Sequence, residues 1–536
     1  MIGKKKTVFL GARVVTMWDE LPEAEAVCVS DGRIECVGSE EDVLRFAAAG
    51  GTAPQRVELQ GVLYPGFIDT HSHLSSYAEC LDQAFCGSSR GSVEGVIQAV
   101  RAHAARNPDD EWVVGYGYDD TGIADKRHLN RHDLDKACPD RPVYVKHISV
   151  HMGYVNTPGL QRLGITADSR FAGGEVHLDE RGEPDGFLLE NAFYRTLSHL
   201  PALSPERFRH NLRRAVAEYN QKGFTTIQDG AVGLNGDAAG TIAAYAELAR
   251  SKELNARVYL QPLAEAMDDL LRYGLWEFGS DRMVLGGVKY FTDGSIQGYT
   301  GALLEDYYSR PGWKGELTYP QQEIDAAILK YFRTGMQIAV HVNGDAAIEA
   351  TLQAFEKARA ACPGVHTRHL FVHAQTASDA QLMRMKACRI VPTLFARHIE
   401  VWGARHYSQF LGPERASRLD PAGSCVRLGI PFGLHVDTPV LPVTALGSMH
   451  AAVNRITDGG RLLGADQRIS PLEALRAYTT YATLCCRGEE DRGRIEPGRY
   501  ADFVLLEEDP ILADPTALRD IKIRMTVCGG EPVYTA

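Results

Sequence analysis

Residues 61–74, GVLYPGFIDTHSHL, form a short apolar run that ends in two histidines, His71 and His73. Along a β-strand, side chains alternate between the two faces, so residues two positions apart point the same way. Neutral imidazole is the commonest protein ligand for zinc, and two imidazoles on one strand face supply half of a ligand set. Two polar residues in a loop after a strand would give the same letters, so the rest of the chain decides between these interpretations.

Seven further strand-like runs follow residue 220, and each ends in polar residues. They lie at residues 223–230, 256–263, 284–294, 337–345, 369–375, 389–395 and 430–439. Helical stretches lie between most of them, for example DAAGTIAAYAELARS (237–251) and QEIDAAILKYFRTG (322–335). With the strand that ends in HSH they make eight βα units. This pattern predicts an α/β fold of the (β/α)8, TIM-barrel type, with its site at the carboxyl ends of the strands.

Both ends of the chain contain short strands separated by turns. Residues 6–64 alternate in strand fashion, and Asp31-Gly32 is a hairpin signal. The tail repeats this style in GRYADFVLLEED (498–509) and KIRMTVCGGEPVY (522–534). We therefore expect residues 1–64 and 488–536 to form one composite β-sandwich.

The remaining residues, 65–487, are assigned to the barrel domain. This range includes a long segment after the first strand, residues 75–220, which mixes helices and polar loops. Such a segment is too long for an ordinary loop. Because it starts two residues after His73, we expect it to form an insertion subdomain over the barrel mouth.

The composition limits the class of protein and its partners. The 44% apolar and 24% charged fractions are those of a soluble globular protein. The net charge of −12 argues against nucleic acid, because a phosphate-binding surface needs a basic excess. No apolar run has membrane-spanning length, and the N-terminus reads as a first strand rather than a signal peptide. The eleven cysteines lack a CxxC pair, which indicates free thiols and a cytoplasmic location.

Six side chains that can bind metal fall at the ends of the predicted strands: His71, His73, Lys289, His341, His373 and Asp437. Each alone has another explanation. Lys289 could pair with Asp293 or Asp229. The later histidines could be hydrogen-bonded core residues, and Asp437 could cap a helix before Thr438-Pro439. Six donors at one end of a single barrel nevertheless predict a metal centre.

The motifs around these residues resemble those of the amidohydrolase superfamily, specifically its YtcJ-like branch, which includes N-substituted formamide deformylases. They are PGFIDTHSHL (65–74), VKYFTDGSIQGYTGALL (288–304), HVNGDAAI (341–348), HAQ (373–375) and GRIEPGRYADFVLLEEDP (493–510). The resemblance covers nearly the whole chain. It implies that the six residues form a metal centre with one or two divalent ions, most often zinc, and that a homodimer is the family-level expectation.

Two motifs depart from the branch pattern. Gly344-Asp345-Ala346-Ala347 stands where Gly-Asp-Arg-Ala is usual, and residues 434–439, LHVDTP, stand where Gly-Ser-Asp-Ala-Pro is usual. His435 is therefore new at a position two residues before Asp437. It could contact substrate, add a polar group or fill space, and the sequence leaves its role open.

Lys289 needs a chemical reason to act as a ligand, since a protonated amine has no lone pair. Burial and nearby positive charge lower a lysine pKa. The neutral amine can then add CO2 to give a carbamate, a carboxylate that can bridge two metals. The resemblance implies this modification of Lys289.

The expected reaction is hydrolysis of an amide-type, non-peptide C–N bond of a small molecule. Metal lowers the pKa of water and so supplies hydroxide near neutral pH. Asp437 would take the proton from the attacking water and pass it to the leaving amine. His151 matches a family position near the site and could donate to the oxyanion. Trp112, Tyr116 and Tyr118, in the inserted segment, are further candidates for lining the substrate pocket.

Three other functions compete with this interpretation. An ester, lactone or carbamate hydrolase would use the same centre. A cytosine- or adenine-type deaminase commonly uses a Glu three residues after the strand-5 histidine, where this chain has Gly344. A binding protein that had lost catalysis would have no reason to keep six ligands.

Overall fold

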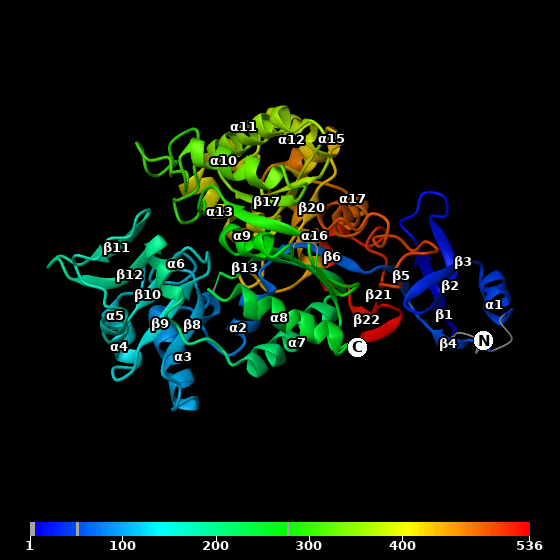
Figure 1. The fold of residues 1–536 in the computed structure, drawn as a ribbon, viewed down its shortest axis with the longest axis horizontal. Coiled ribbons are helices and arrows are strands. Elements are labelled where there is room, and N and C mark those ends of the chain that lie inside the picture. The colour runs from blue at the N-terminus through cyan, green and yellow to red at the C-terminus, as the bar shows by residue number, and fades with distance from the viewer. Residues whose placement is uncertain (1–5, 50–52, 235, 276–277) are drawn as a thin grey trace.

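The computed structural model describes residues 6–49, 53–234, 236–275 and 278–536. Its centre is a barrel of parallel strands surrounded by helices, with a separate layer at each side (Figure 1). The predicted (β/α)8 class is therefore confirmed. Within the described residues, no helix combines the length and the apolar character that crossing a membrane requires.

The eight barrel strands occur in the predicted order. They are β6 (Phe67–Ser72), β13 (Phe224–Val232), β14 (Arg257–Pro262), β15 (Met283–Leu285) continued by β16 (Gly287–Phe291), β17 (Gln337–Val342), β18 (His369–His373), β19 (Ile390–Leu394) and β20 (Gly433–Leu434). The hydroxyl of Thr70 on β6 donates to the carbonyl of Leu434 on β20 (2.9 Å), and Leu263 bridges to Lys289 between β14 and β16. These contacts join the two parts of the barrel.

The fourth and eighth strands differ from their predicted extents. Residues 284–294 were expected to be one strand, but Gly286 interrupts it; a Cβ there would stand 1.9 Å from the ring of Tyr259. In the eighth, residues 430–439, only Gly433–Leu434 is regular, so Asp437 lies in the following loop.

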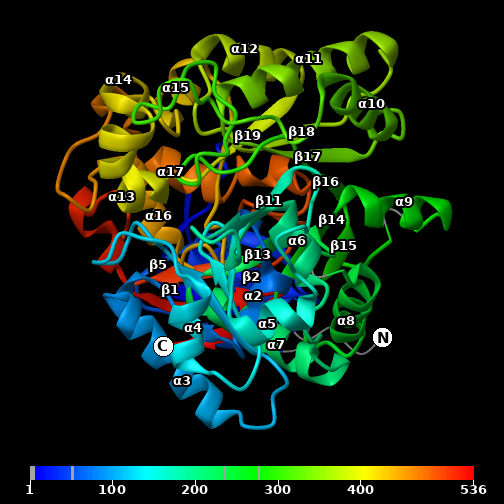
Figure 2. The ribbon, with the colours of Figure 1, turned by 90° about the vertical axis from the view of Figure 1, so that its left-hand side faces the viewer.

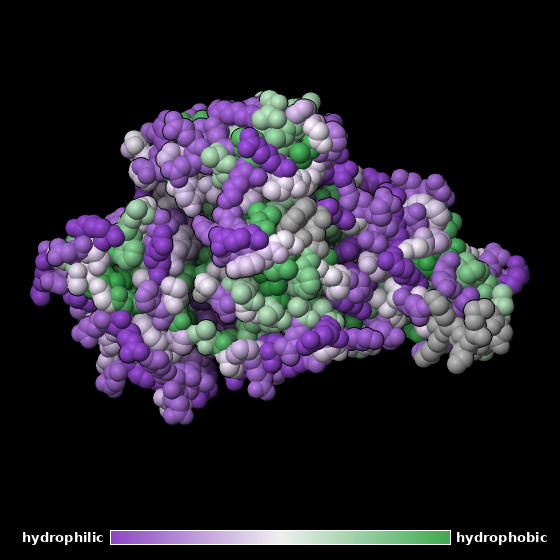
Figure 3. Space-filling model, in the orientation of Figure 1, coloured by the Kyte–Doolittle hydropathy of each residue, from purple (hydrophilic) through white to green (hydrophobic). Residues whose placement is uncertain are grey.

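Helices connect the barrel strands and cover them on the outside. They are α2 (Leu74–Cys80), α7 (Pro205–Gln221), α8 (Ala238–Arg250), α9 (Ala264–Arg272), α10 (Gln321–Phe332), α11 (Asp345–Ala361), α12 (Asp379–Ala387), α13 (Arg397–Arg405), α14 (Gly412–Ser417), α15 (Ala422–Arg427), α16 (Ala445–Asn454) and α17 (Pro471–Tyr478). The two stretches expected to be helical correspond to α8 and α10. Tyr273, Leu275 and Phe278, which follow α9 in the chain, are exposed. Figure 3 shows hydrophobic residues gathered in the middle of the face that it draws.

The chain between β6 and β13 contains a second sheet. Its strands are β7 (Ala84–Phe85), β8 (Val113–Tyr118), β9 (Val143–His147), β10 (Met152–Val155), β11 (Gly174–Leu178) and β12 (Pro184–Glu190), with helices α3 (Val93–Arg106), α4 (Arg131–Ala137), α5 (Thr157–Leu163) and α6 (Asn191–Leu197). Figure 2 shows this layer in front of the barrel. Helices α2 and α7 fall inside the expected insertion, 75–220, yet both pack on β13. The separate sheet therefore occupies only residues 84–190.

The third layer is an eight-stranded sheet that combines both ends of the chain. It contains β1 (Lys6–Val15), β2 (Glu23–Ser30), β3 (Arg33–Gly38), β4 (Gln55–Glu58), β5 (Val62–Pro65), β21 (Phe503–Leu506), β22 (Ile523–Cys528) and β23 (Glu531–Thr535), with helix α1 (Glu40–Ala48). Strand β5 lies between β1 and β21 and so links the two ends. The predicted Asp31-Gly32 hairpin joins β2 to β3 with two positive φ angles, 50° and 75°.

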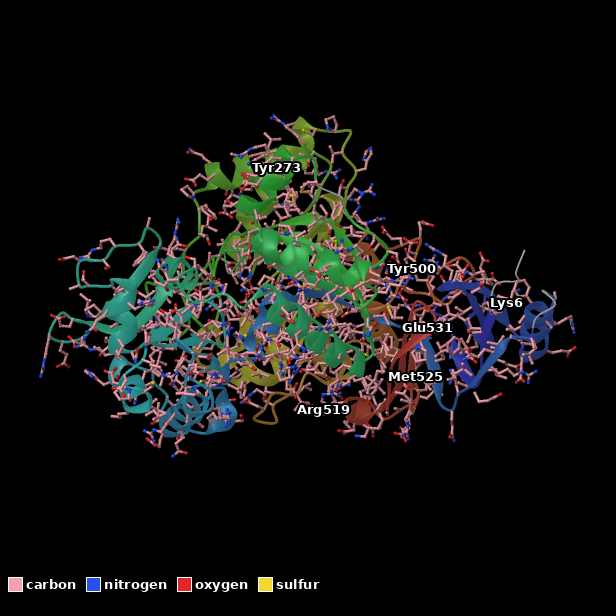
Figure 4. The ribbon with its side chains drawn as sticks, turned by 60° about the horizontal axis from the view of Figure 1, so that its bottom comes forward. Lys6, Tyr273, Tyr500, Arg519, Met525 and Glu531 are labelled. Carbon is pink, nitrogen blue, oxygen red and sulfur yellow. The ribbon has the colours of Figure 1, made fainter. Side chains whose placement is uncertain are left out.

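This sheet is fixed to the barrel by a buried ion pair. Arg257 on β14 makes two hydrogen bonds to the Asp502 carboxylate, of 2.7 and 3.0 Å, and both side chains are almost fully buried. The same guanidinium lies 3.4 Å from the ring centre of Tyr500, which Figure 4 labels at this junction. The guanidinium of Arg33 also approaches this ring, at 4.2 Å from its centre.

Candidate metal centre

The structure brings all six predicted ligand residues to the carboxyl end of the barrel. They are His71 on β6, His73 directly after it, Lys289 on β16, His341 on β17, His373 on β18 and Asp437 after β20. The Nε2 atoms of His71 and His73 each lie 3.5 Å from Asp437 Oδ1, and His373 Nε2 lies 4.0 Å from Asp437 Oδ2. These contacts join the first, sixth and last strands of the barrel in one cluster.

The ion pairs considered for Lys289 do not form. Its Nζ lies 3.1 Å from His71 Nε2. The Asp293 carboxylate instead accepts three backbone N–H groups, and Asp229 accepts the hydroxyl of Tyr245 at 2.8 Å. Lys289 is thus buried among imidazoles rather than beside a structural carboxylate.

The ordinary explanations for Asp437 and His373 also fail. The next helix after Asp437 starts at Ala445, so Asp437 does not cap a helix. His373 Nδ1 is buried without a hydrogen-bond partner among the described residues, which a satisfied core histidine would not leave. Both His373 (φ 72°) and Asp437 (φ 55°) have positive φ, a costly conformation for residues other than glycine that concentrates at functional sites.

Burial sets the protonation of the centre. It lowers the pKa of Lys289, and it lowers the pKa of His73 to about 3. Burial also raises the pKa of Asp437, against the opposing effect of Lys289. The imidazoles are therefore neutral at physiological pH and keep a lone pair for a metal.

Hydrogen bonds decide which nitrogen of two of these rings is free. His73 Nδ1 lies 2.8 Å from the carbonyl of Gly230, so Nδ1 carries the proton and Nε2 is the free nitrogen. His341 Nε2 lies 3.2 Å from the carbonyl of Gly294 and 3.0 Å from the side-chain amide nitrogen of Asn343, so Nε2 is the nitrogen that protein atoms engage. Histidines that bind metal typically have such a hydrogen-bond partner on the ring nitrogen that faces away from the metal.

The donor set fits a divalent ion of the zinc type. His71, His73 and Asp437 have ligand atoms within 4.8 Å of one another, and so do His373, His435 and Asp437. Asp437 Oδ1 is buried and has no hydrogen-bond partner among the described residues. Neutral imidazole and carboxylate are the ligands that zinc takes, and orphaned buried donors are satisfied when an ion binds.

A third group of possible ligands lies in the inserted layer and is already paired. His147 Nε2 contacts Asp120 at 3.0 Å, and Asp119 contacts Arg405 of α13 at 3.3 Å. Asp119 also accepts the backbone N–H groups of Thr121 and Gly122. This cluster is explained as a contact between the insertion and the barrel.

His151, one of the proposed substrate residues, lies beside the centre. Its ring is 5.7 Å from that of His341. Its Nδ1 is 3.0 Å from the Glu190 carboxylate and 2.8 Å from the hydroxyl of Tyr194. Burial works to lower the pKa of His151, but the carboxylates of Glu190, Asp293 and Asp437 together outweigh it, so the pKa lies above its ordinary value. The sequence did not single out Glu190, whose unusual backbone (φ 48°, ψ −121°) aims the carboxylate.

The other three substrate candidates separate in the structure. Trp112 and Tyr116 line a cavity of about 1130 Å³ that also reaches His73. Tyr118 is instead buried in the core of the insertion, where its hydroxyl donates to the carbonyl of Arg127 (2.7 Å), and it does not line either large cavity. A second cavity, of about 1350 Å³, is lined by His151 and Lys289, and it shares Leu234 and Asp237 with the first cavity.

Comparison with known proteins agrees with this architecture. The profile of the Amidohydrolase family matches residues 59–534. The chain is 30% identical to YtcJ of Bacillus subtilis (strain 168), covering 99% of each chain, and 29% identical to the N-substituted formamide deformylase of Arthrobacter pascens, covering 100% of this chain and 99% of that one.

Among solved structures, an uncharacterized metal-dependent hydrolase from Pyrococcus horikoshii OT3 superposes with a TM-score of 0.79 at 23% identity, covering 95% of this chain and 99% of that one. At this identity the likeness supports the fold. With the family profile spanning the barrel together with β5, β21, β22 and β23 of the terminal sheet, the chain belongs to the amidohydrolase family and is a hydrolase of carbon–nitrogen bonds other than peptide bonds.

Proposed function

We propose that the protein hydrolyses an amide-type bond of a small molecule at a centre of one or two divalent ions, with zinc as the resident metal. The residues that would hold the metal are His71, His73, Lys289, His341, His373 and Asp437. The observation that carries the proposal is the orphaned Asp437 Oδ1, which stands 3.5 Å from two neutral imidazoles at the barrel mouth.

A divalent ion held here supplies Lewis acidity, which makes water a nucleophile near neutral pH and polarises a carbonyl group. Lys289 is proposed to carry a carbamate. The lowered pKa of Lys289, caused by burial, favours the neutral amine that reacts with CO2. The resulting anion would reside beside His71, whose Nε2 lies 3.1 Å from Lys289 Nζ, with the carboxylates of Asp437 and Asp293 on neighbouring histidines.

The protons are assigned to two residues. Asp437 would accept a proton from the attacking water and return it to the nitrogen of the leaving amine. His151, whose Nδ1 lies 3.0 Å from Glu190, would donate from Nε2 to the developing oxyanion. Glu190 and Tyr194 both hold Nδ1, which orients the ring toward the second cavity.

The substrate is proposed to be a small amide, with N-substituted formamides as the first class to test because of the deformylase relative. The inserted layer, proposed as a subdomain over the site, lines one cavity through Trp112 and Tyr116, and this cavity reaches His73. The second cavity reaches Lys289 and Asp293. Two cavities that reach different residues of the centre suit a substrate with an acyl part and an amine part.

The test uses the full chain, stripped with a chelator and reloaded with zinc. The panel pairs N-substituted formamides and other amides with esters of the same acyl groups and with aminopyrimidines. We expect amide hydrolysis that disappears on stripping and returns with zinc. Activity that survives complete stripping, or a zinc enzyme that cleaves only the esters or deaminates, would refute the proposal.

A further inference from the structure

His435 is the residue at the centre that the six-ligand set does not use. It directly follows β20 and is completely buried. Neither of its ring nitrogens has a hydrogen-bond partner among the described residues. A neutral imidazole has one N–H donor and one lone pair, and buried polar atoms of native proteins are almost always satisfied. The ring therefore needs a partner that protein atoms do not provide.

The surroundings of the ring narrow the choice of partner. Phe395 lies against it, with ring centres 5.0 Å apart and planes at 31°. On the other sides, the rings of His71 and His373 lie 5.4 and 5.0 Å away. The near polar groups are thus residues of the metal centre, and Phe395 confines His435 against them.

The spacing of the donor atoms suits a shared ion. Ligand atoms of His373, His435 and Asp437 lie within 4.8 Å of one another, the same limit that His71, His73 and Asp437 meet. Donors around a tetrahedral zinc stand roughly 3.4 Å apart, given bonds of about 2.0–2.1 Å. The two groups share Asp437, whose two carboxylate oxygens face them separately: Oδ1 approaches His71 and His73, and Oδ2 approaches His373.

We propose that His435 is a seventh metal ligand, which with His373 and Asp437 forms a second cation site beside that of His71, His73 and Asp437. This inference rests on the proposed metal-dependent function and deepens it. Two imidazoles and one carboxylate select a borderline ion such as Zn²⁺ or Co²⁺ over Mg²⁺ or Ca²⁺, which prefer oxygen ligands. The second site is therefore selective for ions that accept nitrogen.

The test measures metal binding directly. Chelator-stripped wild-type, H435Q and H398Q proteins are equilibrated with Zn²⁺, and bound metal is measured by elemental analysis. His398 is a matched control: it is buried, it packs on the same Phe395, and its Nδ1 is engaged with His406 at 3.2 Å. We expect H435Q to lose one ion or bind it at least tenfold more weakly, whereas H398Q binds as wild type. Mg²⁺ should not replace the lost ion.

A second measurement does not depend on a variant folding. In crystals of zinc-loaded wild-type protein, an anomalous difference peak is expected about 2.1 Å from a ring nitrogen of His435. A metal position more than about 3 Å from both ring nitrogens of His435 would overturn the inference. Unchanged zinc binding in H435Q would also overturn it, including the case in which only the KM of that variant rises. Zinc bound at His435 in a protein that hydrolyses no amide would support the inference and refute the proposed function.

Discussion

Asp437 is the residue that connects the metal centre with proton transfer. Its carboxylate reaches three histidines, and its backbone N–H donates to the carbonyl of His71 at 3.2 Å. Asn keeps the shape of Asp but cannot take a proton from water. We expect Asp437→Asn to lower kcat by at least ~10²-fold, the lower range for removing a positioned acid–base group. Steady-state kinetics with metal analysis of the same sample measures this effect.

Asp420→Asn provides the matched control for that variant. Asp420 is also a buried aspartate with positive φ (48°), and burial raises its pKa to about 8, but it lies outside both groups of candidate ligands. The Asp420→Asn variant should keep kcat within about twofold of wild type. Near-normal turnover in Asp437→Asn with metal retained would show that Asp437 is structural.

Lys289 is the second residue with a chemical prediction of its own. Lys289→Ala removes the amine that lies 3.1 Å from His71, and with it the proposed carbamate. We expect loss of one bound ion and of most activity, with partial recovery when a short carboxylic acid is added in place of the missing anion. Activity assays with and without the acid, at matched zinc, measure the recovery. A free amine on Lys289 in a crystal of active, zinc-loaded enzyme would contradict the carbamate.

Single residues were predictable from the sequence where chemistry and periodicity coincide. His71, His73, His341 and His373 were found because each ends a predicted strand, and the barrel brings strand ends together. Glu190 and Tyr194 were not found, because their contact with His151 depends on pairing of β10 with β12 and on an unusual backbone angle. No local sequence signal encodes the pairing of these two strands or this backbone angle.

At the scale of elements, the inserted sheet is the part expected to decide specificity. Trp112 and Tyr116 both belong to the β8 region and face a cavity that reaches His73. We expect Trp112→Ala and Tyr116→Ala to change the ratio of kcat/KM for two amides that differ only in the leaving amine, by about tenfold, within the range for lost pocket contacts. Bound zinc should stay constant.

The matched control for these variants is Tyr118→Phe. Tyr118 lies on the same strand but is buried in the insertion core, so removing its hydroxyl deletes the bond to Arg127 without changing a cavity wall. The Tyr118→Phe variant should leave the ratio of kcat/KM for the two amides unchanged. If all variants slow both amides by one common factor, the insertion is a structural cover and specificity belongs to the barrel loops.

Elements were predictable in type more than in extent. The periodic patterns gave the eight barrel strands, because parallel buried strands are continuous apolar runs. The break of the fourth strand at Gly286 was missed because its cause, the ring of Tyr259, comes from a neighbouring strand. Helices α2 and α7 were assigned to the insertion because chain order does not show that both pack on β13.

For the whole molecule, Arg257 and Asp502 form a buried ion pair between the barrel and the terminal sheet. Removing one partner of a buried pair leaves the other charge uncompensated, at a cost of roughly 3–5 kcal/mol. We expect Arg257→Met to lower the free energy of unfolding by that amount in urea at pH 7. The exposed Arg33, which approaches the same Tyr500, is the control, and Arg33→Met should cost less than about 1 kcal/mol.

The same pair predicts a dependence on pH. Burial alone would raise the pKa of Asp502, but Arg257 outweighs it and the pKa is lowered. A carboxyl group whose pKa is lower in the folded chain than in the unfolded chain stabilises the fold at pH values above its unfolded pKa of about 3.9. That stability is lost as the pH falls through the pKa of the folded state. Arg257→Met should therefore lose less stability than wild type between about pH 5 and 3. Equal losses of stability in the variant and in wild type over this pH range would show that Arg257 does not lower the pKa of Asp502.

The position of β5 between β1 and β21 has a consequence for synthesis. Tyr64 on β5 pairs with Val504, which the ribosome adds about 440 residues later. At roughly 5–20 residues per second, that interval is between about 20 and 90 s. Throughout it, the nascent chain presents an unpaired apolar strand edge, the kind of surface on which chains aggregate. A holdase chaperone that shields residues 62–65 during elongation would therefore raise the yield of folded protein more than one that acts after release.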